Sequence, residues 1–99
     1  MSTKLEDSQK EKLKEEVPKK YKVIFHNDDY TPFEFVIFIL IDYFSKDESE
    51  AFQIAKNIHN DGKGIAGVFT KDIAETKSVQ VNFIAQQNEF PLLSTIEIE

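Results

Sequence analysis

The chain has 99 residues, of which 40% are hydrophobic and 30% charged, so it is long and apolar enough for one globular domain and wholesale disorder is excluded. Cysteine is absent, which excludes disulfides, thiolate zinc sites and cysteine nucleophiles. The net charge is −6, and all 12 basic residues are lysine. Nucleic-acid binding needs a basic face and favours arginine, so an acidic surface that attracts cationic partners is expected instead.

Hydropathy gives no indication of a membrane segment. Residues 1–7 contain no apolar stretch, so we expect no signal peptide. The longest apolar run, residues 35–41, has seven residues, whereas a membrane span needs about 20. We therefore expect a cytoplasmic protein with no membrane partner.

Two segments differ in character. Residues 1–20 carry six lysines and five acidic residues but almost no apolar side chains, which predicts a flexible N-terminal tail. The tail is either a solvated arm without a role or a handle for a partner. Residues 21–99 have a net charge of −7 and form the predicted folded domain.

The first half of the domain predicts a strand and two helices. Residues 21–26 are β-branched and aromatic, as in a strand, and residues 27–30 are turn formers. Thr31, Pro32 and Glu34 have the spacing of a helix start with a capping box, and the helix runs to about residue 44. Ser45 and Glu48 repeat this spacing before a second helix that runs to about residue 60.

The second predicted helix places Phe52, Ala55, Ile58 and His59 near one face, and Gly62 is a plausible stop. Residues 65–69 then predict a short strand. Thr70 caps a predicted third helix, residues 72–87, with a buried face made of Ile73, Ala74, Val81, Ile84 and Ala85. Pro91 precedes a last strand, residues 92–98, in which polar and apolar side chains alternate.

The element order β-α-α-β-α-β predicts a small two-layer α/β (α+β) sandwich with a three-stranded antiparallel sheet packed on three helices. The helices are expected on one face of the sheet. The helix over residues 33–44 has almost no polar face. It is either a central helix covered on both sides or the wall of a partly exposed apolar pocket.

Polar side chains that could carry chemistry cluster at the end of the first strand. Residues 26–29 read His-Asn-Asp-Asp, which is either a simple turn or a loop that holds a metal ion or an ammonium group. His59, near the end of the second helix, is either a packed or helix-end residue or a ligand. A metal-dependent hydrolase using Asp28, Asp29 and His59 is an alternative.

Enzyme motifs are otherwise missing. The sequence contains no GxxxxGK[ST] loop, no HExxH and no GxSxG. We therefore expect a binding protein without catalytic activity, metal or cofactor.

Several segments, in order, resemble the ClpS family, the bacterial adaptors that deliver N-degron substrates to a Clp AAA+ protease. The resemblance rests on the sequence NDDYTPFEFV at residues 27–36, His59 with Gly62-Lys63, GVFT at 67–70, IAETK at 73–77 and NEFPLL at 88–93. It covers nearly all of residues 21–99. The residues of the tail do not match.

The resemblance implies a site for a free α-amine and the first side chain of a substrate, which family members prefer as Leu, Phe, Tyr or Trp. The implied ammonium ligands are Asn27, Asp28, Asp29 and His59. The implied hydrophobic pocket consists of Thr31, Phe33, Val36, Ile39, Ala55, Ile58 and Leu92.

Two pocket positions depart from the family, because Phe33 and Ala55 stand where methionine is common. Phenylalanine is stiffer and bulkier than methionine and alanine is smaller, so the pocket has a different shape. We expect the stiff Phe33 to reject β-branched Ile and Val at the substrate N-terminus.

The resemblance also implies a partner. Asp72, Glu75 and Lys77 would contact the N-terminal domain of a ClpA-type (or ClpC-type) unfoldase, and the tail would approach its pore. We expect a monomer. The alternative is a docking domain like that of the ribosomal stalk protein, without N-degron binding, which would have no use for the Asn-Asp-Asp loop and His59.

Overall fold

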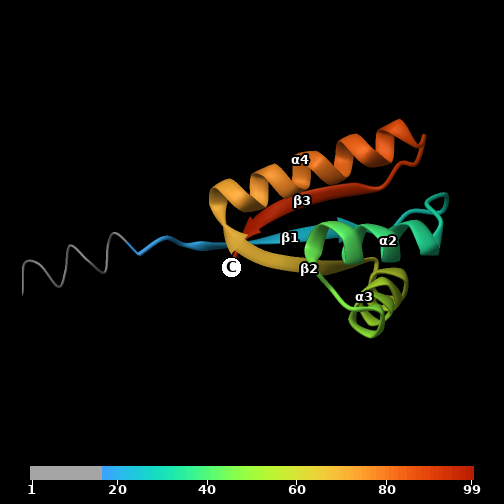
Figure 1. The fold of residues 1–99 in the computed structure, drawn as a ribbon, viewed down its shortest axis with the longest axis horizontal. Coiled ribbons are helices and arrows are strands. Elements are labelled where there is room, and N and C mark those ends of the chain that lie inside the picture. The colour runs from blue at the N-terminus through green and yellow to red at the C-terminus, as the bar shows by residue number, and fades with distance from the viewer. Residues whose placement is uncertain (1–16) are drawn as a thin grey trace, which may run out of the picture.

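The computed structural model describes residues 17–99. Its elements, in chain order, are β1 (Lys20–His26), α2 (Phe33–Phe44), α3 (Glu48–Asp61), β2 (Lys63–Thr70), α4 (Lys71–Gln87) and β3 (Leu93–Ile98), as Figure 1 shows. The strands form one antiparallel sheet in the order β2-β1-β3. This confirms the predicted fold class. Within the described residues, no helix has both the length and the apolarity that a membrane span requires.

The central strand β1 sets the register of the sheet. Against β3 it pairs Tyr21 with Ile98 and His26 with Leu93. The pairing with β2 shifts between Val23 and Ile24, which inserts a bulge. The backbone N–H of Glu99 donates to the carbonyl of Lys20 at 2.9 Å. The C-terminus therefore lies beside the start of β1 (Figure 1).

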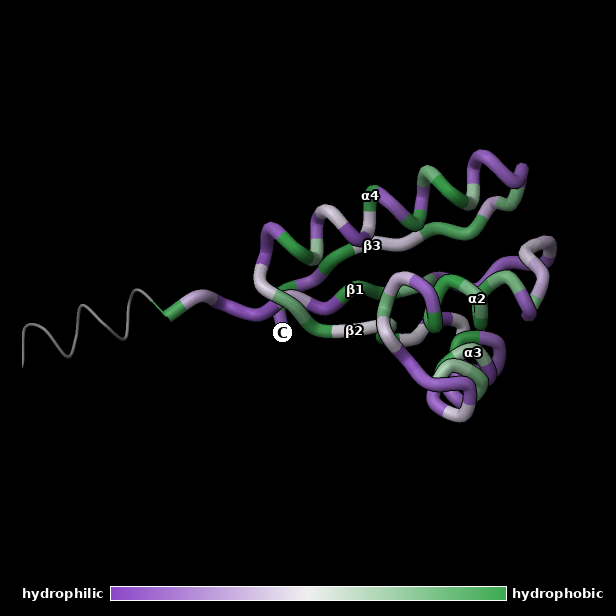
Figure 2. Tube along the Cα trace, viewed as in Figure 1, coloured by the Kyte–Doolittle hydropathy of each residue, from purple (hydrophilic) through white to green (hydrophobic). Residues whose placement is uncertain are grey.

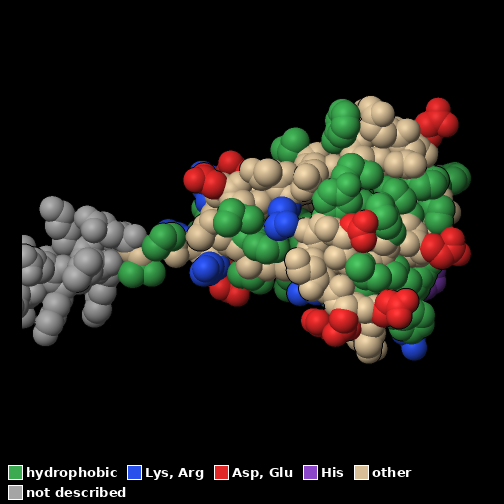
Figure 3. Space-filling model, in the orientation of Figure 1, with side chains coloured by type: hydrophobic (Ala, Val, Ile, Leu, Met, Phe, Trp, Pro, Cys, Tyr) green, Lys and Arg blue, Asp and Glu red, His purple; other side chains and the backbone are tan. Residues whose placement is uncertain are grey.

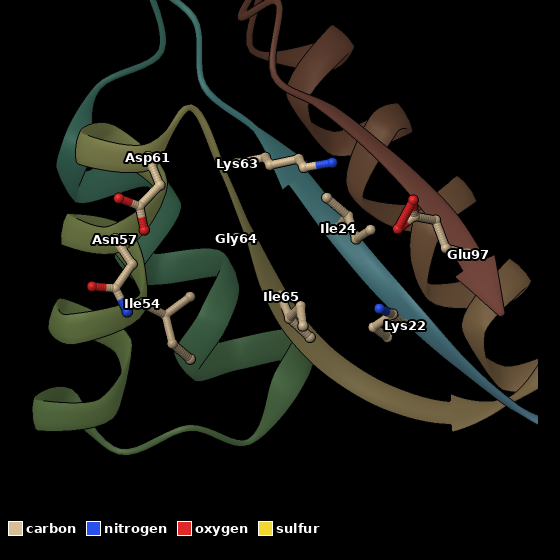
Figure 4. Close-up of a pocket in the computed structure, with 9 residues that line it drawn as sticks. All are labelled: Lys22, Ile24, Ile54, Asn57, Asp61, Lys63, Gly64, Ile65 and Glu97. Atoms are coloured by element: carbon tan, nitrogen blue, oxygen red, sulfur yellow. The ribbon is translucent and has the colours of Figure 1, made fainter. Parts of the chain in front are cut away.

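The two faces of the sheet differ. Val23 and Phe25 are fully buried in the core, whereas Lys22 and Ile24 point to the other face, as strand alternation requires. Helices α2 and α4 pack on the core side, and α3 lies along the free edge of β2 (Figures 1 and 4). The expectation that all three helices share one face is therefore corrected for α3. This edge position forms one wall of the site described below.

The apolar helix α2 is partly a covered central helix and partly exposed at the surface, so each of the two predicted alternatives holds for one part of it. One side is buried in the core through Val36, Ile39, Leu40 and Phe44. On another side, the ring of Phe35 packs edge-to-face on Phe90, with the centroids 4.9 Å apart. Phe38 remains exposed. The tube along α2 is accordingly mostly green in Figure 2, and hydrophobic side chains reach the surface at this end of the molecule in Figure 3.

Two predicted helix starts are wrong in detail. Helix α2 has Pro32, and not Thr31, at its N-cap position. Ser45 ends α2 in the left-handed conformation (φ 55°) instead of capping the next helix. The cap of α3 is Asp47, whose carboxylate accepts from the backbone N–H of Glu50 at 2.8 Å.

The third helix and the last strand differ by small shifts from the prediction. Helix α4 begins at Lys71, after Thr70, whose side chain makes no capping hydrogen bond. Ile73 is exposed and not buried, and Ile84 is only half-buried, while the other predicted core positions of α4 are buried. Strand β3 begins at Leu93. Ser78 and Ser94 join α4 to β3 in the interior, with their hydroxyl oxygens 2.8 Å apart.

Candidate functional site

The loop between β1 and α2 is organised by one carboxylate. Oδ1 of Asp28 accepts the backbone N–H groups of Tyr30 at 2.8 Å and of Thr31 at 2.7 Å. Its Oδ2 accepts the hydroxyl of Thr31 at 2.7 Å. The Thr31 side chain is therefore occupied by Asp28, which is why it does not cap α2. These three bonds fix the path of the chain from the sheet to the helix.

The same contacts determine the ionisation of Asp28. Partial burial raises the pKa of this carboxyl, but the hydrogen bonds from the Thr31 hydroxyl and from the amides of Thr31 and Tyr30 lower it by more. The net pKa of Asp28 is lowered. The loop therefore holds a permanent negative charge at neutral pH.

The C-terminal end of α3 lies opposite this loop. The backbone N–H of Asn27 donates to the carbonyl of Gly62 at 2.8 Å. Gly62 ends α3 in the left-handed conformation (φ 89°), and its N–H donates to the carbonyl of Ile58 at 2.9 Å. This turn places His59, in the last turn of α3, beside the Asn-Asp-Asp loop.

Between the loop, the start of α2 and the end of α3 lies a pocket of about 300 Å³. Its lining combines polar and apolar side chains: Asn27, Asp28, Asp29, Thr31, Phe33, Val36, Ala55, Ile58 and His59. Asn27, Asp29 and His59 are exposed, whereas Val36, Ala55 and Ile58 are buried. The pocket thus has a polar, acidic rim at the surface and an apolar interior.

Nine of the eleven residues expected at the amine and side-chain sites line this pocket. The other two, Ile39 and Leu92, are buried members of the hydrophobic core and do not line the pocket. Within residues 17–99, no three His, Cys, Asp or Glu residues are grouped as metal ligands would be.

The chain matches one protein family over residues 16–95: the ATP-dependent Clp protease adaptor protein ClpS. The chain belongs to the ClpS family. The ClpS adapter of Pectobacterium carotovorum subsp. carotovorum is 53% identical over 91 residues, which cover 92% of this chain and 84% of that protein. The ClpS adapter of Shewanella piezotolerans is 53% identical over 93 residues, which cover 94% and 89%. The predicted family is thereby confirmed.

A solved ClpS structure has the same fold. Agrobacterium tumefaciens ClpS2 bound to L-phenylalaninamide superposes with a TM-score of 0.80 at 39% sequence identity. The match covers 83% of this chain and 99% of that one.

The three residues that the ClpS resemblance assigns to the unfoldase lie on α4, but they are not equivalent. Asp72 and Glu75 are exposed. Lys77 is half-buried, because its ammonium donates to the carbonyl of Tyr43 at 2.6 Å and lies 5.3 Å from the ring centroid of Phe44. Its charge therefore serves the C-terminal end of α2 inside the domain.

A second, shallower concavity of about 450 Å³ lies on the other face of the sheet (Figure 4). Ile24, Ile54 and Ile65 supply its apolar part, and the lysines and acidic residues that surround them are Lys22, Lys63, Asp61 and Glu97. None of the amine, pocket or unfoldase residues that the ClpS resemblance implies lines this concavity. It shares α3 with the pocket, since adjacent sides of this helix face the two concavities.

The apolar wall of the pocket depends on a glycine behind it. A Cβ atom on Gly64 would lie 2.7 Å from Cγ1 of Ile58, which is closer than packed atoms come. We expect Gly64→Ala to push Ile58 toward the pocket and to lower the free energy of unfolding by about 1–3 kcal/mol, the usual cost of overpacking. Urea denaturation measures this change.

The matched control removes the Ile58 side chain, which a Cβ atom on Gly64 would otherwise meet. In an Ile58→Ala background, the added methyl group meets no clash, so Gly64→Ala should cost much less there than in the wild-type chain. Equal costs in both backgrounds would show that the strain lies in the backbone of β2 and not against Ile58.

Proposed function

We propose that this chain is an N-degron adaptor. It binds proteins whose first residue is large and hydrophobic (Leu, Phe, Tyr or Trp) and delivers them to a ClpA-type unfoldase that feeds the ClpP protease. It acts as a monomer in the cytoplasm and catalyses no reaction itself. The observation that carries the proposal is the pocket, in which an acidic, hydrogen-bonding rim lies directly above an apolar interior.

The rim fits a free chain terminus. An α-amine has a pKa of about 7.7–8.0, so it is mostly cationic at neutral pH and needs acceptors and negative charge. Asn27, Asp29 and His59 offer exposed acceptor atoms, and the charge of Asp28 lies among them. An acetylated terminus has neither the positive charge nor the same donors, so the rim discriminates against it.

The interior fits one apolar side chain. Burying a Leu or Phe side chain contributes roughly 1.5–3 kcal/mol, which excludes small and polar first residues. Phe33 lines the pocket at its exposed side and Ala55 in its buried interior, so side chains that are not branched at Cβ should enter and β-branched Ile and Val should not. The L-phenylalaninamide in the related ClpS2 structure carries a free amine and an aromatic side chain, which supports this assignment.

Delivery involves the opposite end of the domain. Asp72 lines a hollow of about 560 Å³ together with residues 17–19 and Tyr21, where the described chain begins. Residues 1–16, most of the expected tail, lie outside the described residues. An unfoldase that contacts Asp72 and Glu75 would therefore also meet residues 17–19, near the end of the expected tail.

The test is fluorescence anisotropy with a labelled peptide that begins with Phe, compared with the same peptide acetylated at its N-terminus. We expect acetylation to weaken binding about 100-fold, because the charged hydrogen bonds at the rim are lost together. A peptide that begins with Ser serves as the control for the apolar interior and should bind as poorly. Equal binding of the free and acetylated Phe peptides would refute amine recognition.

A further inference from the structure

Two phenylalanines form an aromatic pair beside the pocket. Phe33, the first residue of α2, lines the pocket, and Phe52, on α3, does not. Their ring centroids are 5.6 Å apart with the planes tilted by 47°. We call this pair the aromatic shelf. Although the rings pack on each other, Phe33 is 36% and Phe52 is 52% exposed.

Packing does not explain the exposure of the shelf. The other apolar residues of α3 that share this face, Ala55 and Ile58, are buried in the core. Phe52 is thus the point at which the buried face of α3 continues as exposed apolar surface, contiguous with the pocket through Phe33. An apolar surface that continues a binding pocket can contact more of the same ligand.

The part of a bound peptide that follows its first residue has to run out of the pocket along an exposed surface. Its amine points to the rim at His59 and Asn27, and its first side chain fills the interior. Phe52 lies seven residues before His59 on α3, which at 1.5 Å per residue is about 10 Å along the helix. The second Cα atom of an extended peptide lies about 3.8 Å beyond the first, and a long side chain covers much of the remaining distance.

We propose that the aromatic shelf, Phe33 with Phe52, binds the second side chain of the substrate and favours large apolar or aromatic residues at that position. This inference rests on the proposed function, because it requires the amine at the rim. Aromatic contacts of this kind are directional and supplement the simple burial of area. Phe33 therefore touches both the first and the second side chain, whereas Phe52 touches only the second.

The experiment compares two peptides that begin with Leu and carry Phe or Ala at the second position. In the wild-type chain, we expect the Phe peptide to bind about three- to tenfold more tightly. In Phe52→Ala this ratio should fall close to one, while the affinity for the Ala peptide stays within about twofold. Phe83→Ala is the matched control, because Phe83 is a similarly exposed (59%) helix residue on α4 and should leave the ratio unchanged.

Each outcome decides the proposal. If Phe52→Ala weakens both peptides by the same factor, Phe52 only supports Phe33, and the shelf is not a binding site for the second residue. If the wild-type chain does not distinguish the two peptides, the proposal is wrong even if Phe52→Ala fails to fold. Both results leave the proposed function intact as long as N-acetylation still abolishes binding of either peptide.

Discussion

Replacing Asp28 with alanine is expected to weaken binding of a peptide with a free N-terminal Phe by about 10- to 100-fold. The change removes the negative charge from the rim and all three hydrogen bonds that fix the loop. The free energy of unfolding should also fall, by about 1–2 kcal/mol, since each bond contributes modestly on balance. Anisotropy and urea denaturation measure the two effects separately.

Asp28→Asn separates the two roles. An asparagine keeps one oxygen that can accept from the amides of Tyr30 and Thr31, but it has no charge. We expect binding to fall nearly as far as in Asp28→Ala, with most of the stability retained. Wild-type affinity in Asp28→Asn would show that the charge does not contribute to amine binding.

Because the pKa of Asp28 is lowered in the folded state, the contribution of Asp28 to the free energy of unfolding depends on pH. A carboxyl whose pKa is lower in the folded state contributes fully above its ordinary pKa of 3.8, and the contribution disappears as the pH falls through the folded-state value. The stability difference between the wild-type chain and Asp28→Ala should therefore be complete at pH 7 and narrow below about pH 4. A difference that is the same at pH 7 and pH 3 would contradict the assignment.

The largest loss of stability is expected from Phe25→Ala, about 3–5 kcal/mol of unfolding free energy. Phe25 is fully buried on the central strand, and its ring meets Phe44 edge-to-face with the centroids 5.4 Å apart. The substitution removes this contact and leaves a cavity between β1 and α2. Thermal or urea unfolding gives the change.

Two further variants serve as controls for the stability loss expected in Phe25→Ala. Phe25→Leu fills part of the cavity and should cost less than Phe25→Ala. Phe83→Ala removes the same side chain from an exposed position and should change stability by no more than about 0.5 kcal/mol. Similar losses in Phe25→Ala and Phe83→Ala would mean that the core does not depend on the Phe25 ring.

The resemblance to the ClpS family supplied the expected site residues, and short local signals explain why the polar ones lie close together. The Asn-Asp-Asp turn after a strand and the helix start at Pro32 are adjacent in the chain, and His59 precedes a helix-ending glycine. Nine of the eleven residues that the resemblance implies meet in one pocket. Ile39 and Leu92 are also apolar, and no local pattern distinguishes the wall of a pocket from the core beneath it.

The remaining errors have tertiary causes. Thr31 fits a capping box, but Asp28 occupies its hydroxyl. The expected partner contact needs an exposed Lys77, but its ammonium donates to a carbonyl 34 residues away and lies beside an aromatic ring, which leaves it half-buried. Phe52 was placed on the correct face of its helix, but only the structure shows that this face extends beyond the core and meets Phe33. Contacts between distant segments decide these positions, and periodicity does not record them.

The length of strand β1 sets the distance between the pocket and the end of the domain where the described chain begins. The pocket adjoins one end of this strand at His26, and the start of the described chain and the C-terminus lie at its other end, at Lys20. Six steps of about 3.3 Å separate these two poles by about 20 Å. If the unfoldase contacts the Lys20 end, as proposed above, transfer from the pocket to it takes about six residues of extended polypeptide. Under that proposal, a substrate whose unstructured N-terminal segment is shorter than this binds in the pocket but does not reach the unfoldase.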